Sequence, residues 1–214
     1  MEEHHLTVKR TARYHALGDP GTARHLWIVL HGYGQLARFF LRPFVGLEED
    51  RLIAAPEGLS RFYTDAAHSR VGSSWMTSED RLQEIRDQAD YLNTLAAHLA
   101  RQCPPGTPLN VLGFSQGVAT AARWALASAL PIARLVCWGG SLPPEPDAAG
   151  LASRWAHIAI DLVQGEQDVL VPAAALQRNE ARLREAGLKY RVLQFPGAHE
   201  LDRLTLQRVL NEPL

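Results

Sequence analysis

Six short apolar runs are spread along the chain, and each has the length of a buried strand. They are HLWIVLHG (25–32), RLIAAPEG (51–58), PLNVLGF (108–114), RLVCWGG (134–140), HIAIDLVQG (157–165) and YRVLQF (190–195). The N-terminal segment LTVKRTARYHAL (6–17) alternates roughly between apolar and polar residues, which is typical of an edge strand or a hairpin. The pattern predicts a sheet whose central strands are buried. Residues 59–78, rich in small and polar side chains, are expected to form a loop.

Between several of these runs the apolar residues follow a helical spacing. In the clearest case they recur every three or four residues and predict one apolar helix face, made of Leu82, Ile85, Ala89, Leu92, Leu95, Ala96 and Leu99. Thr77 and Asp80 have the spacing of a capping box at the start of this helix. Two further helices are predicted over 115–130 and 172–188, the second ending at Gly187.

This alternation of strands and helices predicts an α/β fold, with a mainly parallel central sheet flanked by helices. A chain of 214 residues has the size of one well-buried domain, so we expect a single domain over residues 1–214. The intervals between elements are short, and no large lid domain is expected. Open parallel sheets bind ligands at the carboxyl ends of their strands. Candidate functional residues should therefore follow strands directly.

Charge and composition exclude several classes of function. The formal net charge is −1 without any basic run, which argues against a nucleic-acid partner. The N-terminus is acidic where a signal peptide would be basic, and no apolar window is long enough for a membrane span, so we expect a cytoplasmic protein. Cys103 and Cys137 are too few for a disulfide framework or a metal knuckle and should be free thiols.

One of the predicted strands ends at a serine flanked by glycines. The segment Gly113-Phe114-Ser115-Gln116-Gly117 has the form G-x-S-x-G and stands where a strand pattern changes to a helix pattern. In such an elbow the serine occupies a strained turn that exposes its hydroxyl, and side chains two positions away would collide. An ordinary glycine turn with an incidental serine is the alternative. The position at a strand-to-helix switch favours Ser115 as a nucleophile.

A serine nucleophile needs a histidine base, which in this kind of fold follows it in the chain. Only His157 and His199 come after Ser115. His157 opens a strand and would lie at the amino edge of the sheet, whereas His199 follows the strand 190–195 and would lie at the carboxyl edge. We therefore predict His199 as the base. Because the base must be neutral, activity should fall in acid.

The acid that orients the base should come between the serine and the histidine. Glu166 and Asp168 both follow the strand 157–165, and Asp168 is preferred because the loop then turns at Val171-Pro172 into a helix. Glu166 is the second choice. Asp161 lies within the strand, too far from its carboxyl end, and is expected to be a carboxylate that is satisfied by its partners, either buried or at the rim of the sheet.

The reaction also needs two donors for the oxyanion. One is the backbone N–H of Gln116, the residue after the nucleophile. The other should come from the loop after the strand 25–32, where Tyr33 is the first choice and Gly34 the second. His31 in the same loop is expected to be a structural hydrogen-bonding residue. No metal is expected there, because no other ligand stands at a suitable spacing.

The motifs LHGYG, GFSQG, GEQDVLVP and GAHE, in this order, resemble those of the phospholipase/carboxylesterase family of α/β-hydrolases, which includes acyl-protein thioesterases. The resemblance extends from about His25 to Leu210. It implies an α/β-hydrolase fold with Ser115, Asp168 and His199 as the catalytic triad. Trp75 matches a tryptophan that the family carries before its long helix, but the residues after it do not match.

The expected function is hydrolysis of short- to medium-chain carboxylic esters, or of thioesters, by a serine carboxylesterase without a cofactor. The expected partner is a small-molecule ester or thioester, and a homodimer is left open. Trp75, Phe62 and Tyr63 would wall an acyl pocket or pack against the sheet edge. Phe39, Phe40 and Phe44 would form the core face of a helix, with a pocket role as the alternative.

Other functions remain as alternatives. They are an acyl-protein thioesterase or lysophospholipase-like activity, a small peptidase, and a non-catalytic binding protein on a hydrolase fold. A dienelactone-type hydrolase would carry cysteine at position 115, and this chain has serine.

Overall fold

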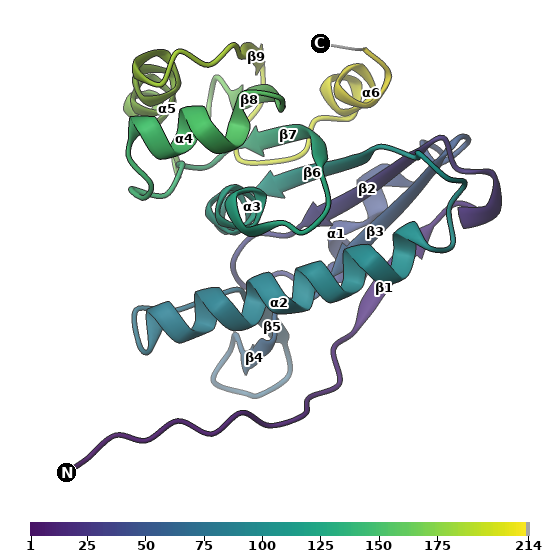
Figure 1. Cartoon of the computed structure of the whole chain (residues 1–214). Helices are drawn as coiled ribbons and strands as arrows, with labels where there is room; N and C mark the ends of the chain where they lie inside the picture. Colours follow the sequence, from purple (N-terminus) through teal and green to yellow (C-terminus); the bar gives the residue numbers. More distant parts are fainter. Residues whose placement is uncertain (213–214) are drawn as a thin grey trace.

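A seven-stranded sheet forms the centre of the protein (Figure 1). The computed structural model describes residues 1–212. The strands lie in the order β1-β3-β2-β6-β7-β8-β9, and only the edge strand β1 is antiparallel to its neighbour. Their bounds are β1 Tyr14–Leu17, β2 His25–Leu30, β3 Arg51–Pro56, β6 Leu109–Phe114, β7 Ile132–Trp138, β8 Ala159–Gly165 and β9 Arg191–Phe195. The predicted mainly parallel sheet is confirmed.

Helices cover both faces of the sheet, as Figure 1 shows. Their bounds are α1 Ala37–Phe40, α2 Arg81–Ala100, α3 Gln116–Ala127, α4 Ala148–Trp155, α5 Ala173–Glu185 and α6 Arg203–Asn211, and two short 3-10 turns span Pro20–Thr22 and Arg42–Phe44. Helices α2 to α5 share one apolar core with the sheet, while α1, α6 and Phe44 share the other. Since both faces are covered, the inner strands are almost wholly buried and need continuous apolar runs.

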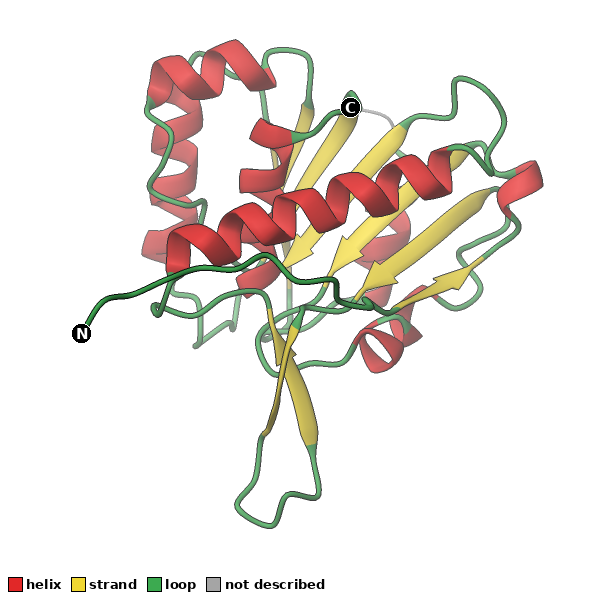
Figure 2. Cartoon of the chain, turned by 60° about the horizontal axis from the view of Figure 1, so that its bottom comes forward, coloured by secondary structure: helices red, strands yellow, loops and turns green. Residues whose placement is uncertain are grey.

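A second, two-stranded sheet occupies the region that was expected to be a loop. Strands β4 (Ser60–Tyr63) and β5 (Val71–Ser74) pair antiparallel and form a hairpin. Figure 2 shows this hairpin projecting away from the central sheet. In β5, a Cβ on Gly72 would lie 2.4 Å from the carbonyl oxygen of Gly34, so only a glycine permits this close approach of the two backbones.

Two elements begin differently from the expectation. The edge strand expected in the N-terminal segment is confirmed over Tyr14–Leu17, and residues 1–13 carry no regular structure. The capping box does not form, because Asp80 adopts a left-handed conformation and its side chain makes no capping bond. Instead Glu84 accepts a hydrogen bond from the Thr77 amide at 2.6 Å. Leu82, placed on the apolar face by its spacing, is 64% exposed.

Within residues 1–212, no helix has both the length and the apolar character needed to cross a membrane.

Candidate active site

Three sequence-predicted residues follow neighbouring strands of the parallel sheet. Ser115 follows β6, Asp168 lies in the loop after β8, and His199 lies in the loop after β9. Because β6, β7, β8 and β9 are consecutive in the sheet, their carboxyl ends form one continuous edge. Ser115, Asp168 and His199 therefore all lie at this edge of the sheet.

Ser115 has the backbone geometry of a strained turn. Its φ is 55° and its ψ is −118°, a conformation that is costly for a residue with a side chain. Its amide donates to the carbonyl of Trp138 at 2.9 Å, and its carbonyl accepts from Val118 at 3.0 Å. These bonds hold the turn between β6 and α3 and leave the Ser115 side chain half-exposed.

The flanking glycines make this turn possible. A Cβ on Gly113 would lie 2.4 Å from the carbonyl oxygen of Gly117, and a Cβ on Gly117 would lie 2.3 Å from the carbonyl oxygen of Leu30. Both distances are far below van der Waals contact, so no larger residue fits without moving the backbone. Close packing of the elbow against its own strand and against β2 explains both glycines of the motif.

His199 and Asp168 form a direct hydrogen bond. The Nδ1 of His199 lies 2.7 Å from Oδ2 of Asp168. The other carboxylate oxygen accepts hydrogen bonds from the amides of Leu170 and Val171, both at 2.9 Å. The Asp168 side chain is only 1% exposed, and these donors fix its orientation. With Nδ1–H facing the carboxylate, the Nε2 of His199 is free to accept a proton.

The loop after β7 brings Ser115 and His199 into the same region. Gly139 has a positive φ of 55°, and a Cβ there would lie 3.4 Å from the His199 ring and 3.5 Å from the Asp168 carboxylate. A Cβ on Gly140 would lie 2.5 Å from the carbonyl oxygen of Ser115. Within residues 1–212 no hydrogen bond joins the Ser115 hydroxyl to His199, and such bonds often tighten only when substrate binds.

Asn179 on α5 holds that loop and was not identified from the sequence. Its side chain accepts from the Leu142 amide and donates to the Gly140 carbonyl, both at 2.9 Å. A buried asparagine on a predicted helix is a weak signal, because its partners lie almost forty residues away along the chain.

The loop after β2 contains the two backbone amides that the sequence offers as oxyanion donors, those of Tyr33 and Gly34. Gly32 donates to the side chain of Gln35 at 2.8 Å, and Gly34 donates to the carbonyl of Ser73 at 2.9 Å. Within the described part of the chain, the Tyr33 amide has no acceptor, and neither has the amide of Gln116. A Cβ on Gly32 would lie 3.1 Å from the Cβ of Ser115, so this loop lies against the turn that holds Ser115. The amide of Gly34, the second choice as an oxyanion donor, is already used in its hydrogen bond to the Ser73 carbonyl.

His31 is a fully buried structural residue. Its Nδ1 donates to the Gly32 carbonyl at 2.7 Å, and its Nε2 accepts from the Gly58 amide at 3.0 Å and lies 3.0 Å from the Ser73 hydroxyl. Burial lowers the pKa of His31 below its ordinary value of 6.5, although the Gly32 carbonyl and the Glu57 charge act in the opposite direction. Protonation would bring an N–H against the Gly58 N–H, so His31 stays neutral and ties the loop to the hairpin.

Trp75 does not line the site, and the expectation that it binds substrate is contradicted. Its side chain is completely buried, stacks against His31 with ring centroids 4.9 Å apart, and donates from Nε1 to the His31 carbonyl at 2.8 Å. The side chain of Gln116 accepts from the Trp75 amide at 3.1 Å and donates to the Met76 carbonyl at 2.8 Å. The glutamine of the GFSQG motif thus holds the chain after the hairpin.

A cleft of about 400 Å³ opens beside His199. Its lining is mainly apolar and comprises Gly34, Gln35, Leu36, Phe39, Phe40, Pro43, Val71, Phe114, His199, Glu200 and Leu201. Phe40 and Phe44 are buried as expected for a core face, whereas Phe39 is 45% exposed and faces the cleft. Tyr63, expected to bind substrate, is 57% exposed on the hairpin and is not among these residues. Phe62 stacks on Tyr33, with ring centroids 5.1 Å apart.

The other acidic and basic candidates make no contact with Ser115 or His199 among the described residues, or they are paired. Glu166 is exposed, and within residues 1–212 its side chain makes no hydrogen bond. His157 is exposed just before β8, at the opposite edge of the sheet. Asp161 is fully buried and pairs with Arg134 at 2.5 Å and Arg191 at 2.7 Å, which agrees with the expected paired carboxylate.

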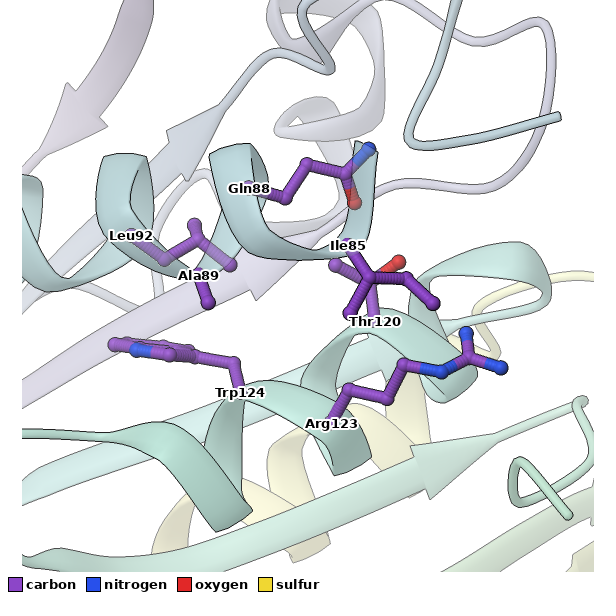
Figure 3. Close-up of a pocket in the computed structure, with 7 residues that line it drawn as sticks. All are labelled: Ile85, Gln88, Ala89, Leu92, Thr120, Arg123 and Trp124. Carbon is purple, nitrogen blue, oxygen red and sulfur yellow. The ribbon is translucent and has the colours of Figure 1, made fainter. Parts of the chain in front are cut away.

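A second cavity lies between α2 and α3 (Figure 3). It is lined by Ile85, Gln88, Ala89, Leu92, Thr120, Arg123 and Trp124. Its volume of about 10 Å³ is at the lower limit for a single water molecule. The buried hydroxyl of Thr120 has no partner among the described residues, which fits such a water. The cavity is too small for a substrate.

The two cysteines and one cluster of possible metal ligands lie outside the cleft. Cys103 and Cys137 are buried free thiols, and burial raises the pKa of Cys137 to about 12, which keeps it protonated. Glu3, His5 and Asp80 place possible ligand atoms within 4.8 Å of one another, but all three are exposed and none lines the cleft.

Comparison with known proteins identifies the family. The family model for phospholipase/carboxylesterase matches residues 19–212. The chain belongs to the phospholipase/carboxylesterase family. This family consists of ester hydrolases, and the central sheet with its flanking helices is the α/β-hydrolase fold. Among curated protein sequences, none matches the chain significantly.

Solved structures of esterases and thioesterases share the fold of this family member. Esterase PE8 has a TM-score of 0.71 at 20% identity, covering 96% of this chain and 100% of its own. Acyl-protein thioesterase 2 of Zea mays has a TM-score of 0.73 at 20% identity, covering 94% and 96%. The carboxylesterase of Bacillus cereus has a TM-score of 0.68 at 12% identity, covering 93% and 92%. At these identities the similarity establishes the fold alone.

Proposed function

We propose that this phospholipase/carboxylesterase family member is a serine carboxylesterase for short- to medium-chain esters, with Ser115, His199 and Asp168 as its catalytic triad. The observation that carries the proposal is the 2.7 Å hydrogen bond between His199 and the buried Asp168, at the sheet edge where the strained Ser115 turn also lies. Membership of the family supports ester hydrolysis as the reaction class. The hydrogen bond supports His199 as the base, because it fixes the orientation of the imidazole.

The proposed reaction begins with proton transfer from Ser115 to Nε2 of His199. The serine oxygen attacks the ester carbonyl, and Asp168 stabilises the imidazolium through its bond to Nδ1. The free amides of Tyr33 and Gln116 donate to the oxyanion of the tetrahedral intermediate. His199 then protonates the leaving alcohol, and water hydrolyses the acyl-enzyme by the same steps in reverse.

The cleft supports an apolar acyl or alcohol group as part of the substrate. Leu36, Phe39, Phe40 and Phe114 contribute apolar walls within reach of His199. The volume of about 400 Å³ is at the small end for ligand sites, which favours short and medium chains over long ones.

A thioesterase activity is the second candidate. It uses the same triad and acyl-enzyme, and the fold is shared with an acyl-protein thioesterase of Zea mays. A thiol is a better leaving group than an alcohol, so a thioesterase would also cleave activated esters. Parallel assays on matched esters and thioesters distinguish the two preferences.

The test is hydrolysis of p-nitrophenyl esters from acetate to palmitate by the wild type and Ser115→Ala. We expect turnover that peaks at short or medium chains and disappears in the variant. Ser153→Ala is the matched control, because Ser153 is exposed on α4 and away from the cleft. Equal turnover by the wild type and Ser115→Ala would refute the nucleophile. No turnover of esters or thioesters would favour a non-catalytic binding protein.

A further inference from the structure

Two arginines, one on α1 and one in the 3-10 turn after it, lie over the ring of Phe39. The guanidinium carbon of Arg38 lies 4.5 Å from the centroid of the Phe39 ring, and that of Arg42 lies 4.6 Å from the same centroid. Phe39 lines the cleft that opens beside His199. The cation–π contacts therefore hold both cations against a side chain that forms part of the cleft wall.

Neither arginine has an acidic partner. Within residues 1–212, no hydrogen bond or ion pair joins the side chain of Arg38 or Arg42 to another residue, and both are exposed. A guanidinium stacked on a ring keeps the N–H donors at its edge free to bind an anion.

We propose that Arg38 and Arg42, here called the arginine clamp, bind an anionic group of the substrate. The enzyme then prefers esters that carry a carboxylate on the part lying in the cleft. This inference rests on the proposed esterase function, and it names the chemical class of the substrate. Two guanidinium groups around one apolar ring suit a chain that passes Phe39 and ends in a carboxylate.

Glu200 sets where along the substrate the anion can be placed. It directly follows His199, lines the same cleft, and forms no ion pair with either arginine of the described chain. Its charge repels an anion close to the scissile bond, while the arginine clamp attracts one farther along the cleft. The preference for a carboxylate should therefore grow with the number of methylene groups between it and the ester.

The experiment measures kcat/KM in a pH-stat for matched pairs of anionic and neutral esters. One series compares monoethyl esters of dicarboxylic acids, from succinate to suberate, with ethyl esters of neutral acids of equal length. A second series places the carboxylate on the alcohol side, as in the butyryl ester of glycolate against ethyl butyrate. We expect the wild type to prefer the anionic ester by about tenfold in one of the two series, as charge-assisted hydrogen bonds would provide.

The double variant Arg38→Gln/Arg42→Gln tests the arginine clamp itself. We expect it to lower the ratio of anionic to neutral kcat/KM to about one, the ratio of a site without charge selection. Arg178→Gln is the matched control, because Arg178 is exposed on α5 and does not line the cleft, and it should keep the wild-type ratio. Added salt should lower the wild-type ratio by screening the exposed guanidinium groups.

The same assays separate a failure of the arginine clamp from a failure of the esterase function. Hydrolysis of neutral esters without any anionic preference in either series overturns the arginine clamp and leaves the esterase function standing. A double variant that loses activity on both kinds of ester by the same factor also overturns it, because the arginines would then be structural. If no ester of either kind is hydrolysed, both proposals fail.

Discussion

The carbonyl oxygen of Gly117 lies 2.4 Å from the position that a Cβ on Gly113 would occupy. The two glycines of the nucleophile motif are therefore in contact with each other, across the turn that holds Ser115. This contact explains why the strand β6 and the helix α3 approach so closely at this point.

Gly113→Ala should consequently be severely destabilising. The added methyl group meets backbone atoms that belong to α3 and cannot move independently. We expect the free energy of unfolding to fall by about 3 kcal/mol, the upper end of the usual range for overpacking. Urea denaturation followed by circular dichroism measures the change, and failure to obtain folded protein would agree with it.

Gly21→Ala is the control for that substitution. Its Cβ would lie 3.5 Å from the Asp19 carboxylate, an ordinary contact, so a change within about 0.5 kcal/mol is expected. Equal stabilities of the two variants would show that the elbow tolerates a side chain at Gly113.

Asp168→Asn should abolish most of the activity while leaving the fold intact. The asparagine oxygen can still accept from Leu170 and Val171, which places its NH₂ group against His199. Two donors then face each other, and His199 turns to the tautomer with the proton on Nε2, which cannot accept the serine proton. We expect kcat to fall by about 10⁴-fold, the effect of this change in other triads.

Glu166→Gln is the control for the acid. Glu166 is exposed in the same loop, so its replacement should leave kcat at the wild-type value. The assignment would pass to Glu166 if kcat fell sharply in Glu166→Gln and stayed within tenfold of wild type in Asp168→Asn.

Glu57 should contribute stability that depends on pH. Its buried carboxylate accepts from Arg13 at 2.6 Å, Arg61 at 2.7 Å and the Ala37 amide at 3.3 Å, and so joins the N-terminal segment, the hairpin and α1. Burial favours the neutral acid, but Arg61 and Arg13 outweigh it and hold the pKa of Glu57 below its ordinary value of 4.5.

Because the pKa is lower in the folded state, this stabilisation is complete above the unfolded-state value and is lost as the pH falls through the folded-state value. Glu57→Gln should therefore be less stable than the wild type at neutral pH, by about 1–3 kcal/mol, and the difference should shrink in acid. Denaturation midpoints measured from neutral pH to pH 3 test this. A difference that stays constant over this range would refute the linkage.

Glu145→Gln is the matched control. Glu145 also pairs with two arginines, Arg81 at 2.7 Å and Arg123 at 2.9 Å, but its side chain is 46% exposed. Exposed ion pairs contribute about 0–1 kcal/mol, so its loss should have a much smaller effect.

Replacing Trp75 should strongly lower the stability of the protein, whereas replacing Tyr63 should leave it nearly unchanged. Trp75→Ala removes a fully buried side chain and its bond to the His31 carbonyl, and should cost about 3–5 kcal/mol of stability. Tyr63→Ala changes an exposed hairpin residue and should alter stability by less than about 0.5 kcal/mol. Thermal unfolding measures both, and a mild effect of Trp75→Ala would contradict its supporting role beneath the loop that holds Tyr33.

Local patterns in the sequence were sufficient for the order of the central strands, for the helices α2, α3 and α5, and for the positions of Ser115, Asp168 and His199 after their strands. They did not reveal the β4–β5 hairpin or the helices α4 and α6. Buried parallel strands require continuous apolar runs, and the strained turn requires its glycines, so both leave a signal within a few residues. The rule that ligands gather at the carboxyl ends of parallel strands then separated His199 from His157 without any coordinates.

Only the tertiary structure decided which groups are available to a substrate. The Gly34 amide is occupied because the hairpin brings the Ser73 carbonyl to it, which leaves the Tyr33 amide as the free donor. The burial of Trp75 and the position of Phe39 in the cleft wall also depend on how distant segments pack together. Burial and hydrogen bonding at these positions depend on segments distant in the chain, and the types of the residues do not encode them.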